Sequence, residues 1–125
     1  MPRDRGDAAY LLDMIQAGES VIRYVAGKTR AEYDGNEMLR DAVERKLEII
    51  GEAARRLSEV LRDAHPEIAW RKIMAARHIL AHDYDDVNQD IVWEIATKQV
   101  PQTLTLLRPL VPPIPPDPEP EDDGG

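Results

Sequence analysis

An arginine and two of the three histidines fall within one short stretch, Arg77-His78-Ile79-Leu80-Ala81-His82. Histidine gives and takes protons near neutral pH because its unperturbed pKa is about 6.5, and arginine offers a permanent cationic fork that fits a phosphate. Cleavage of a phosphodiester needs a proton transfer and stabilisation of charge on a phosphorane-like transition state. Arg77 and His82 are therefore a candidate catalytic pair for cutting RNA.

The spacing of this pair does not place both side chains on one face of a helix. Five residues at about 100° per residue leave Arg77 and His82 roughly 140° apart. A symmetric dimer brings two copies of each residue into one cleft, so we expect a composite site in a homodimer. The same spacing also fits a structural role, in which Arg77 pairs with an acid such as Glu52 and His82 binds the last carbonyls of its helix.

His78 and His82 stand four residues apart, as two metal ligands on one helical face do in longer motifs. Asp83 or Asp86 could add a third ligand, which keeps a metal-dependent enzyme open as an alternative. No HExxH or comparable ligand set is present in the sequence, so we expect neither a metal nor another cofactor.

Tyr84 follows two residues after His82, in an acidic stretch with Asp83, Asp85 and Asp86. An exposed tyrosine hydroxyl here is a possible site of modification. The alternative is a half-buried aromatic ring that anchors the loop through a hydrogen bond.

The elements that must position these residues are all helical, since no segment alternates like a strand. Helix stop and cap signals predict an antiparallel up-and-down bundle of four to five helices over residues 1–108. The expected segments are a helix over 7–25, a single turn over 29–33, a long helix from the Asn36 cap to about residue 63, a helix over 70–82, an Asn88-capped helix, and a last helix over 98–108.

Two glycines and two tryptophans bear on how these helices pack. Gly18 weakens the first helix locally, and Gly51 costs the long helix up to about 1 kcal/mol relative to alanine. Close helix packing would justify Gly51, with the next residue, Glu52, reaching toward Arg77. Trp70 and Trp93 are expected in the core rather than in a binding site.

Composition narrows the class of protein. A chain of 125 residues without cysteine has room for one domain and no disulfide. No apolar run is long enough to span a bilayer, and the first seven residues lack a signal peptide, so we expect a soluble cytoplasmic protein without a membrane partner.

Residues 109–125 form a separate segment, with seven of the ten prolines, five acids and no lysine or arginine. This tail is expected to be extended and disordered, with only its apolar start against the bundle. It accounts for five of the eight net negative charges, so the bundle itself is close to neutral. The net negative charge therefore makes nucleic-acid binding a weaker hypothesis but does not exclude it.

The order of Arg77, four residues, His82, one residue and Tyr84 resembles the signature of the HepT-type toxins of the HEPN superfamily. The resemblance extends over about residues 7–108, and the further positions that carry it are Ile50-Gly51-Glu52-Ala53, Pro66-Glu67-Ile68, Trp70, Trp93 and the leucines after Pro101. It implies an all-helical homodimer that acts as a metal-independent endoribonuclease. It further implies a partner, a minimal nucleotidyltransferase antitoxin, with which larger hetero-oligomers can form.

Through this resemblance, Arg77 is expected to bind the scissile phosphate and His82 to act as general acid or base. Tyr84 is expected to accept AMP from the antitoxin, which would add bulk and negative charge beside the cleft and repel RNA. His78 departs from the pattern, because a small polar residue is common there. His78, Glu52 and Asp83 are kept as supporting residues, and a catalytically silent module that binds the nucleotidyltransferase is the alternative.

Overall fold

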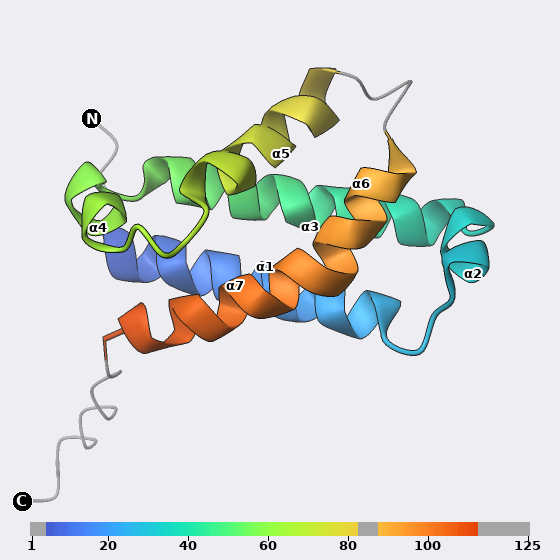
Figure 1. Cartoon of the computed structure of the whole chain (residues 1–125), viewed down its shortest axis with the longest axis horizontal. Coiled ribbons are helices and arrows are strands. Elements are labelled where there is room, and N and C mark those ends of the chain that lie inside the picture. The colour runs from blue at the N-terminus through green and yellow to red at the C-terminus, as the bar shows by residue number, and fades with distance from the viewer. Residues whose placement is uncertain (1–4, 83–87, 113–125) are drawn as a thin grey trace, which may run out of the picture.

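The computed structural model describes residues 5–82 and 88–112, with the backbone alone for residues 77–82. All regular structure in these ranges is helical, which confirms the predicted all-α bundle (Figure 1). The elements are α1 (Asp7–Val25), α2 (Arg30–Asp34), α3 (Glu37–Arg56), α4 (Glu59–Ala64), α5 (Trp70–His82), α6 (Gln89–Glu94), the π-helical segment η1 (Ile95–Gln99), α7 (Val100–Leu107) and the 3-10 turn η2 (Arg108–Leu110).

The core lies between α1 and α3, which run antiparallel and contact each other most extensively (Figure 1). α5 packs on α3, and α7 packs on α1. The largest fully buried side chains are Leu11, Met14, Val21, Val43, Leu104 and Leu107, with Tyr33 from α2. Burying one face of each helix is what holds the bundle together.

Several helix ends form where local side chains predict them. Thr29 and Glu32 make the expected capping box at α2. Asn36 caps α3 by accepting from the Leu39 amide, and Asn88 caps α6. α1 ends as predicted before Gly27, whose φ of 70° suits a residue without a side chain.

The prediction of one long helix up to about residue 63 is wrong, because the chain leaves the helical conformation at Leu57 and Ser58. Both residues are extended, and Ser58 caps a new helix, α4, by accepting from the Leu61 amide at 3.1 Å. The amide and hydroxyl of Ser58 also donate to the Asp7 carboxylate at 2.8 and 2.6 Å. Periodicity hides this break, because Ala54 before it and Leu57 at it are both buried.

Replacing Ser58 by alanine is expected to destabilise the protein by about 1–3 kcal/mol, because it removes a helix cap and one hydrogen bond to a carboxylate. Chemical denaturation would measure the loss. Ser58→Thr is the matched control, since it keeps the hydroxyl and should stay within about 0.5 kcal/mol of the original protein. An alanine variant as stable as the threonine variant would show that the cap does not hold this junction.

The prediction of two separate helices after Asn88 is also wrong, because α6, η1 and α7 follow one another without a break. Pro101 has no amide hydrogen, so the carbonyl of Thr97 cannot accept the usual bond from four residues on. The helix widens just before the proline, where the Val100 amide donates to the Ile95 carbonyl in π-helical register. The proline therefore changes the pitch of this helix instead of dividing it.

The end of α7 leads into the start of the predicted tail. Leu110 and Val111 pack against the core, as expected for the apolar beginning of that segment. The prediction of disorder concerns mainly residues 113–125, which lie outside the described residues.

Candidate active site

α5 carries the signature, and its N-terminal half is firmly held. The Trp70 indole is buried, and its Nε1 donates to the carbonyl oxygens of Arg62 at 3.1 Å and His65 at 2.9 Å. Ala76 is buried as well, on the side of α5 that packs along α3. Trp70 thus belongs to the core, as predicted, and fixes the helix on which Arg77, His78 and His82 are placed.

The backbone of α5 is α-helical up to His82, as the sequence predicts. Regular helical geometry therefore separates the positions of Arg77 and His82 by roughly 140° around the helix axis. The side chains of residues 77–82 are not among those the structure describes, and Asp83 and Tyr84 lie outside it altogether. The roles expected of Arg77, His78, His82, Asp83 and Tyr84 stay predictions.

Glu52 is half-buried on α3, beside the buried Gly51. Its carboxylate accepts a hydrogen bond from Arg56 Nε at 3.0 Å and lies 3.7 Å from Arg55 Nε. The bond to Glu52 raises the pKa of Arg56. Glu52 is thus held by arginines of its own helix, and its expected contact with Arg77 stays a prediction.

The chain after residues 83–87 is anchored by contacts that the sequence analysis did not find. The Tyr33 hydroxyl donates to Gln89 Oε1, and the Arg30 guanidinium lies 2.7 Å from the Asp90 carboxylate. The Tyr33 ring also packs on Trp93, with 5.1 Å between ring centroids. These contacts join α2 to α6, and they fix the start of α6 directly after the segment that contains Tyr84.

The Tyr33 part of this anchor is buried, whereas the pair of Arg30 and Asp90 is exposed. Burial raises the pKa of the Tyr33 hydroxyl, which therefore stays protonated and able to donate at physiological pH. Burial also raises the pKa of the nearby Glu44, helped by the negative charge of Asp41. No sequence signal pointed to Tyr33 or Gln89, because their positions in the chain are far apart.

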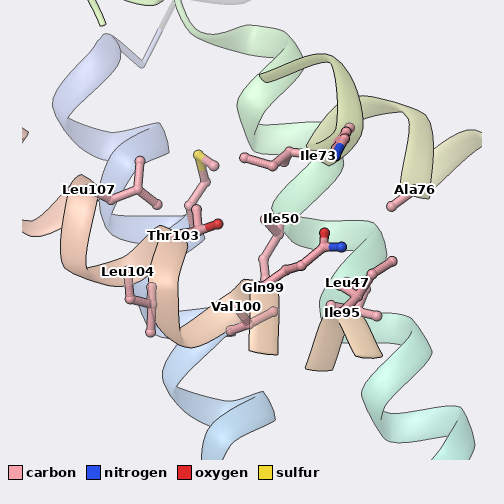
Figure 2. Close-up of a pocket in the computed structure, with 12 residues that line it drawn as sticks. Leu47, Ile50, Ile73, Ala76, Ile95, Gln99, Val100, Thr103, Leu104 and Leu107 are labelled. Carbon is pink, nitrogen blue, oxygen red and sulfur yellow. The ribbon is translucent and has the colours of Figure 1, made fainter. Parts of the chain in front are cut away.

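A small apolar cavity of about 40 Å³ lies where α5 faces η1 and α7 (Figure 2). Ile73 and Ala76 come from α5, and Leu47 and Ile50 from α3. A volume of this size has room for only a few water molecules. The cavity is a packing gap beside α5 and not a pocket for a nucleotide.

Among the side chains of residues 5–76 and 88–112, no group of three or more histidines, aspartates or glutamates is arranged to hold a metal ion. The alternative of a metal site at His78 and His82 with Asp83 or Asp86 falls outside the side chains that this finding covers. None of the described helices is long and apolar enough to cross a membrane.

The helical bundle and its signature-bearing α5 correspond to a known family. The family model described as "Ribonuclease HepT-like" matches residues 14–110, so the chain belongs to the HepT-like ribonuclease family. This confirms the resemblance drawn from Arg77, His82 and Tyr84. The match covers α3, α5 and α7, together with most of α1.

Individual relatives agree with this assignment. The chain is 34% identical over 94 residues to "Putative RNase MJ1380" of Methanocaldococcus jannaschii, covering 75% of this chain and 86% of that protein. It is 36% identical over 93 residues to "Putative RNase TTE0752" of Caldanaerobacter subterraneus, covering 74% and 83%. "Probable ribonuclease HepT" of Thermococcus cleftensis is 30% identical over 97 residues, covering 78% and 88%. No solved structure matched the chain.

Proposed function

We propose that this protein is a HepT-like toxin, a metal-independent endoribonuclease that cleaves RNA at a cleft between two protomers. One observation carries the proposal: a chain that matches the HepT-like family over residues 14–110 has its arginine and histidine signature on a helix that is regular up to His82. The names of its relatives, which describe ribonucleases, support the same activity. The protein acts in the cytoplasm, with no cofactor.

In the proposed reaction, the ribose 2′-oxygen attacks the adjacent phosphorus, and the bond from phosphorus to the 5′-oxygen breaks. Arg77 binds the phosphate and neutralises the charge that grows on its oxygens. His82 takes the proton from the 2′-hydroxyl or gives one to the departing 5′-oxygen. The products are a cyclic phosphate and a 5′-hydroxyl, with His78, Glu52 and Asp83 in supporting roles.

Both residues act in one cleft if two copies of α5 meet across a homodimer axis. The 140° separation on a single regular helix is the physical reason for this arrangement. One protomer then supplies Arg77 and the other supplies His82 to the same cleft.

Silencing follows from a nucleotidyltransferase partner that transfers AMP from ATP to Tyr84. The tyrosine oxygen attacks the α-phosphorus of ATP, pyrophosphate leaves, and the hydroxyl proton passes to a base or to water. The added phosphate places negative charge two residues from His82, where it repels the phosphates of RNA.

Incubation with the nucleotidyltransferase and ATP is expected to raise the intact mass of the protein by one or more AMP units. Mass spectrometry of the intact chain measures this gain, and Tyr84→Phe is the matched control because it removes only the acceptor oxygen. The same mass gain in Tyr84→Phe would place the modification on another residue. No gain in either protein would make plain complex formation the means of silencing.

A catalytically silent module that binds the nucleotidyltransferase is the second candidate, favoured by His78 at a position where nucleases of this superfamily often carry a small polar residue. Expression without the partner separates the two. The toxin arrests growth, whereas the silent module is harmless. Cleavage of RNA that persists in excess chelator would also set aside a metal-dependent enzyme built on His78 and His82.

A further inference from the structure

One face of α5 runs from its N-terminal half to the positions of His78 and of the signature residue His82. Positions 71, 75, 78 and 82 are spaced at i, i+4, i+7 and i+11, so they follow one face of the regular helix. Arg71 and Ala75 are both exposed. We call these four positions the α5 stripe; about 16 Å separates its ends, at 1.5 Å of rise per residue.

Arg71 and its neighbour Lys72 differ from most of the described arginines, which are held by acids. Ion pairs engage Arg5, Arg30, Arg45, Arg55, Arg56 and Arg108. Arg71 and Lys72 are exposed, and neither has a carboxylate within 4.0 Å among the residues that the structure describes. Their charges are therefore available to an anionic ligand.

Both cations line an open groove of about 860 Å³ between α4 and the N-terminal half of α5. Pro66, Ala69 and Met74 give this groove an apolar part. Glu59 and Asp63 line it too, and the Arg62 guanidinium there is turned to the carbonyl oxygens of Ala54 and Arg55. Arg71 and Lys72 are thus the cations of this groove left for a ligand.

We propose that the α5 stripe, with Lys72 beside it, binds the phosphate backbone of single-stranded RNA and leads the strand along α5 to the site at Arg77 and His82. The proposal rests on the proposed function and deepens it by assigning a substrate-binding surface outside the signature. Ala75 lies midway along the stripe and is exposed, so a negative charge placed there would repel a bound strand. A single strand is the fitting ligand, since two adjacent cations on one helix, Arg71 and Lys72, contact one backbone.

Charge placed in the middle of the stripe provides the sharpest test. Ala75→Glu should raise the KM for a single-stranded RNA on the order of tenfold, because a carboxylate there repels the phosphates, while kcat stays the same. Ala75→Gln is the matched control, with nearly the same shape and no charge, and should behave like the original protein. Equal KM values for the two variants would overturn the proposal.

Removal of Arg71 gives a second, independent measurement. Arg71→Ala should weaken binding of a short fluorescein-labelled oligouridylate and reduce the salt dependence of log K by roughly 0.7, the contribution of one phosphate contact on a single strand. Lys28→Ala is the control, because it removes an exposed charge from the turn after α1. An unchanged salt slope in Arg71→Ala would contradict the proposal.

Fluorescence anisotropy reports binding without cleavage, so failure of the inference can be told from failure of the proposed function. If the protein binds the oligouridylate through the stripe but cuts no RNA, the surface stands and the ribonuclease proposal fails. If His82→Ala abolishes cleavage while the stripe variants bind normally, the ribonuclease stands and the surface fails. If the stripe variants bind RNA normally and lose only the nucleotidyltransferase, the stripe is a protein interface and the inference is wrong.

Discussion

His82→Ala is expected to lower the rate of RNA cleavage by about 10²–10⁴-fold, the factor that a positioned general acid or base contributes. Arg77→Ala should lower it by about 10²–10³-fold, because the charge that grows on the phosphate loses its cationic partner. Cleavage rates of the purified variants measure both effects. Cells that express either variant without the partner should grow normally.

His65→Ala is the matched control for His82→Ala. His65 lies between α4 and α5, and its Nδ1 is 3.1 Å from Glu67 Oε1, so the change removes a histidine outside the signature. This variant should keep its activity. A His82→Ala protein that folds normally and cleaves at a rate close to that of His65→Ala would refute the catalytic role.

Mixing the two inactive variants tests the shared cleft in the same assay. A heterodimer of Arg77→Ala with His82→Ala keeps one arginine and one histidine, each from a different protomer. If the cleft combines residues of both protomers, mixing should restore cleavage. If each protomer uses its own pair, every heterodimer stays inactive, and the expectation drawn from the 140° separation is wrong.

Leu104→Ala is expected to destabilise the protein by about 2–5 kcal/mol, the usual effect of truncating a buried leucine. Leu104 is 2% exposed and lies on α7 against α1. Denaturant unfolding measures the change. Leu106→Ala, at a 38% exposed position of the same helix, is the control and should cost much less. If Leu104→Ala cost as little stability as Leu106→Ala, the packing of Leu104 against α1 would contribute little.

The same contact makes the effect of Gly18→Ala depend on Leu104. A Cβ at Gly18 would lie 2.8 Å from Leu104 Cδ2, so alanine there should destabilise the protein, by up to about 3 kcal/mol, through crowding. In the Leu104→Ala background the crowding is gone, and the better helix propensity of alanine should stabilise the protein by up to about 1 kcal/mol. Effects of the same sign in both backgrounds would contradict this coupling.

Much of the fold could be read from the sequence, because most helix ends depend on side chains within a few residues. The Thr29 and Glu32 capping box, the Asn36 cap and the Gly27 stop are contacts of this local kind. The start of α5 at Trp70 also agrees with the prediction. The spacing of Arg77, His82 and Tyr84 likewise led to the family, which the match over residues 14–110 confirms.

Only the tertiary structure decided the features whose partners are distant in the chain. The contact of Ser58 with Asp7 at the helix break and the contact of Tyr33 with Gln89, which ties α6 to α2, span 51 and 56 residues. Helix propensity marks Gly18 as a destabilising position in α1, but its missing side chain leaves the space that Leu104 of α7 fills. Helix propensity and periodicity reach about one turn along the chain, whereas these contacts exist only once the helices have packed.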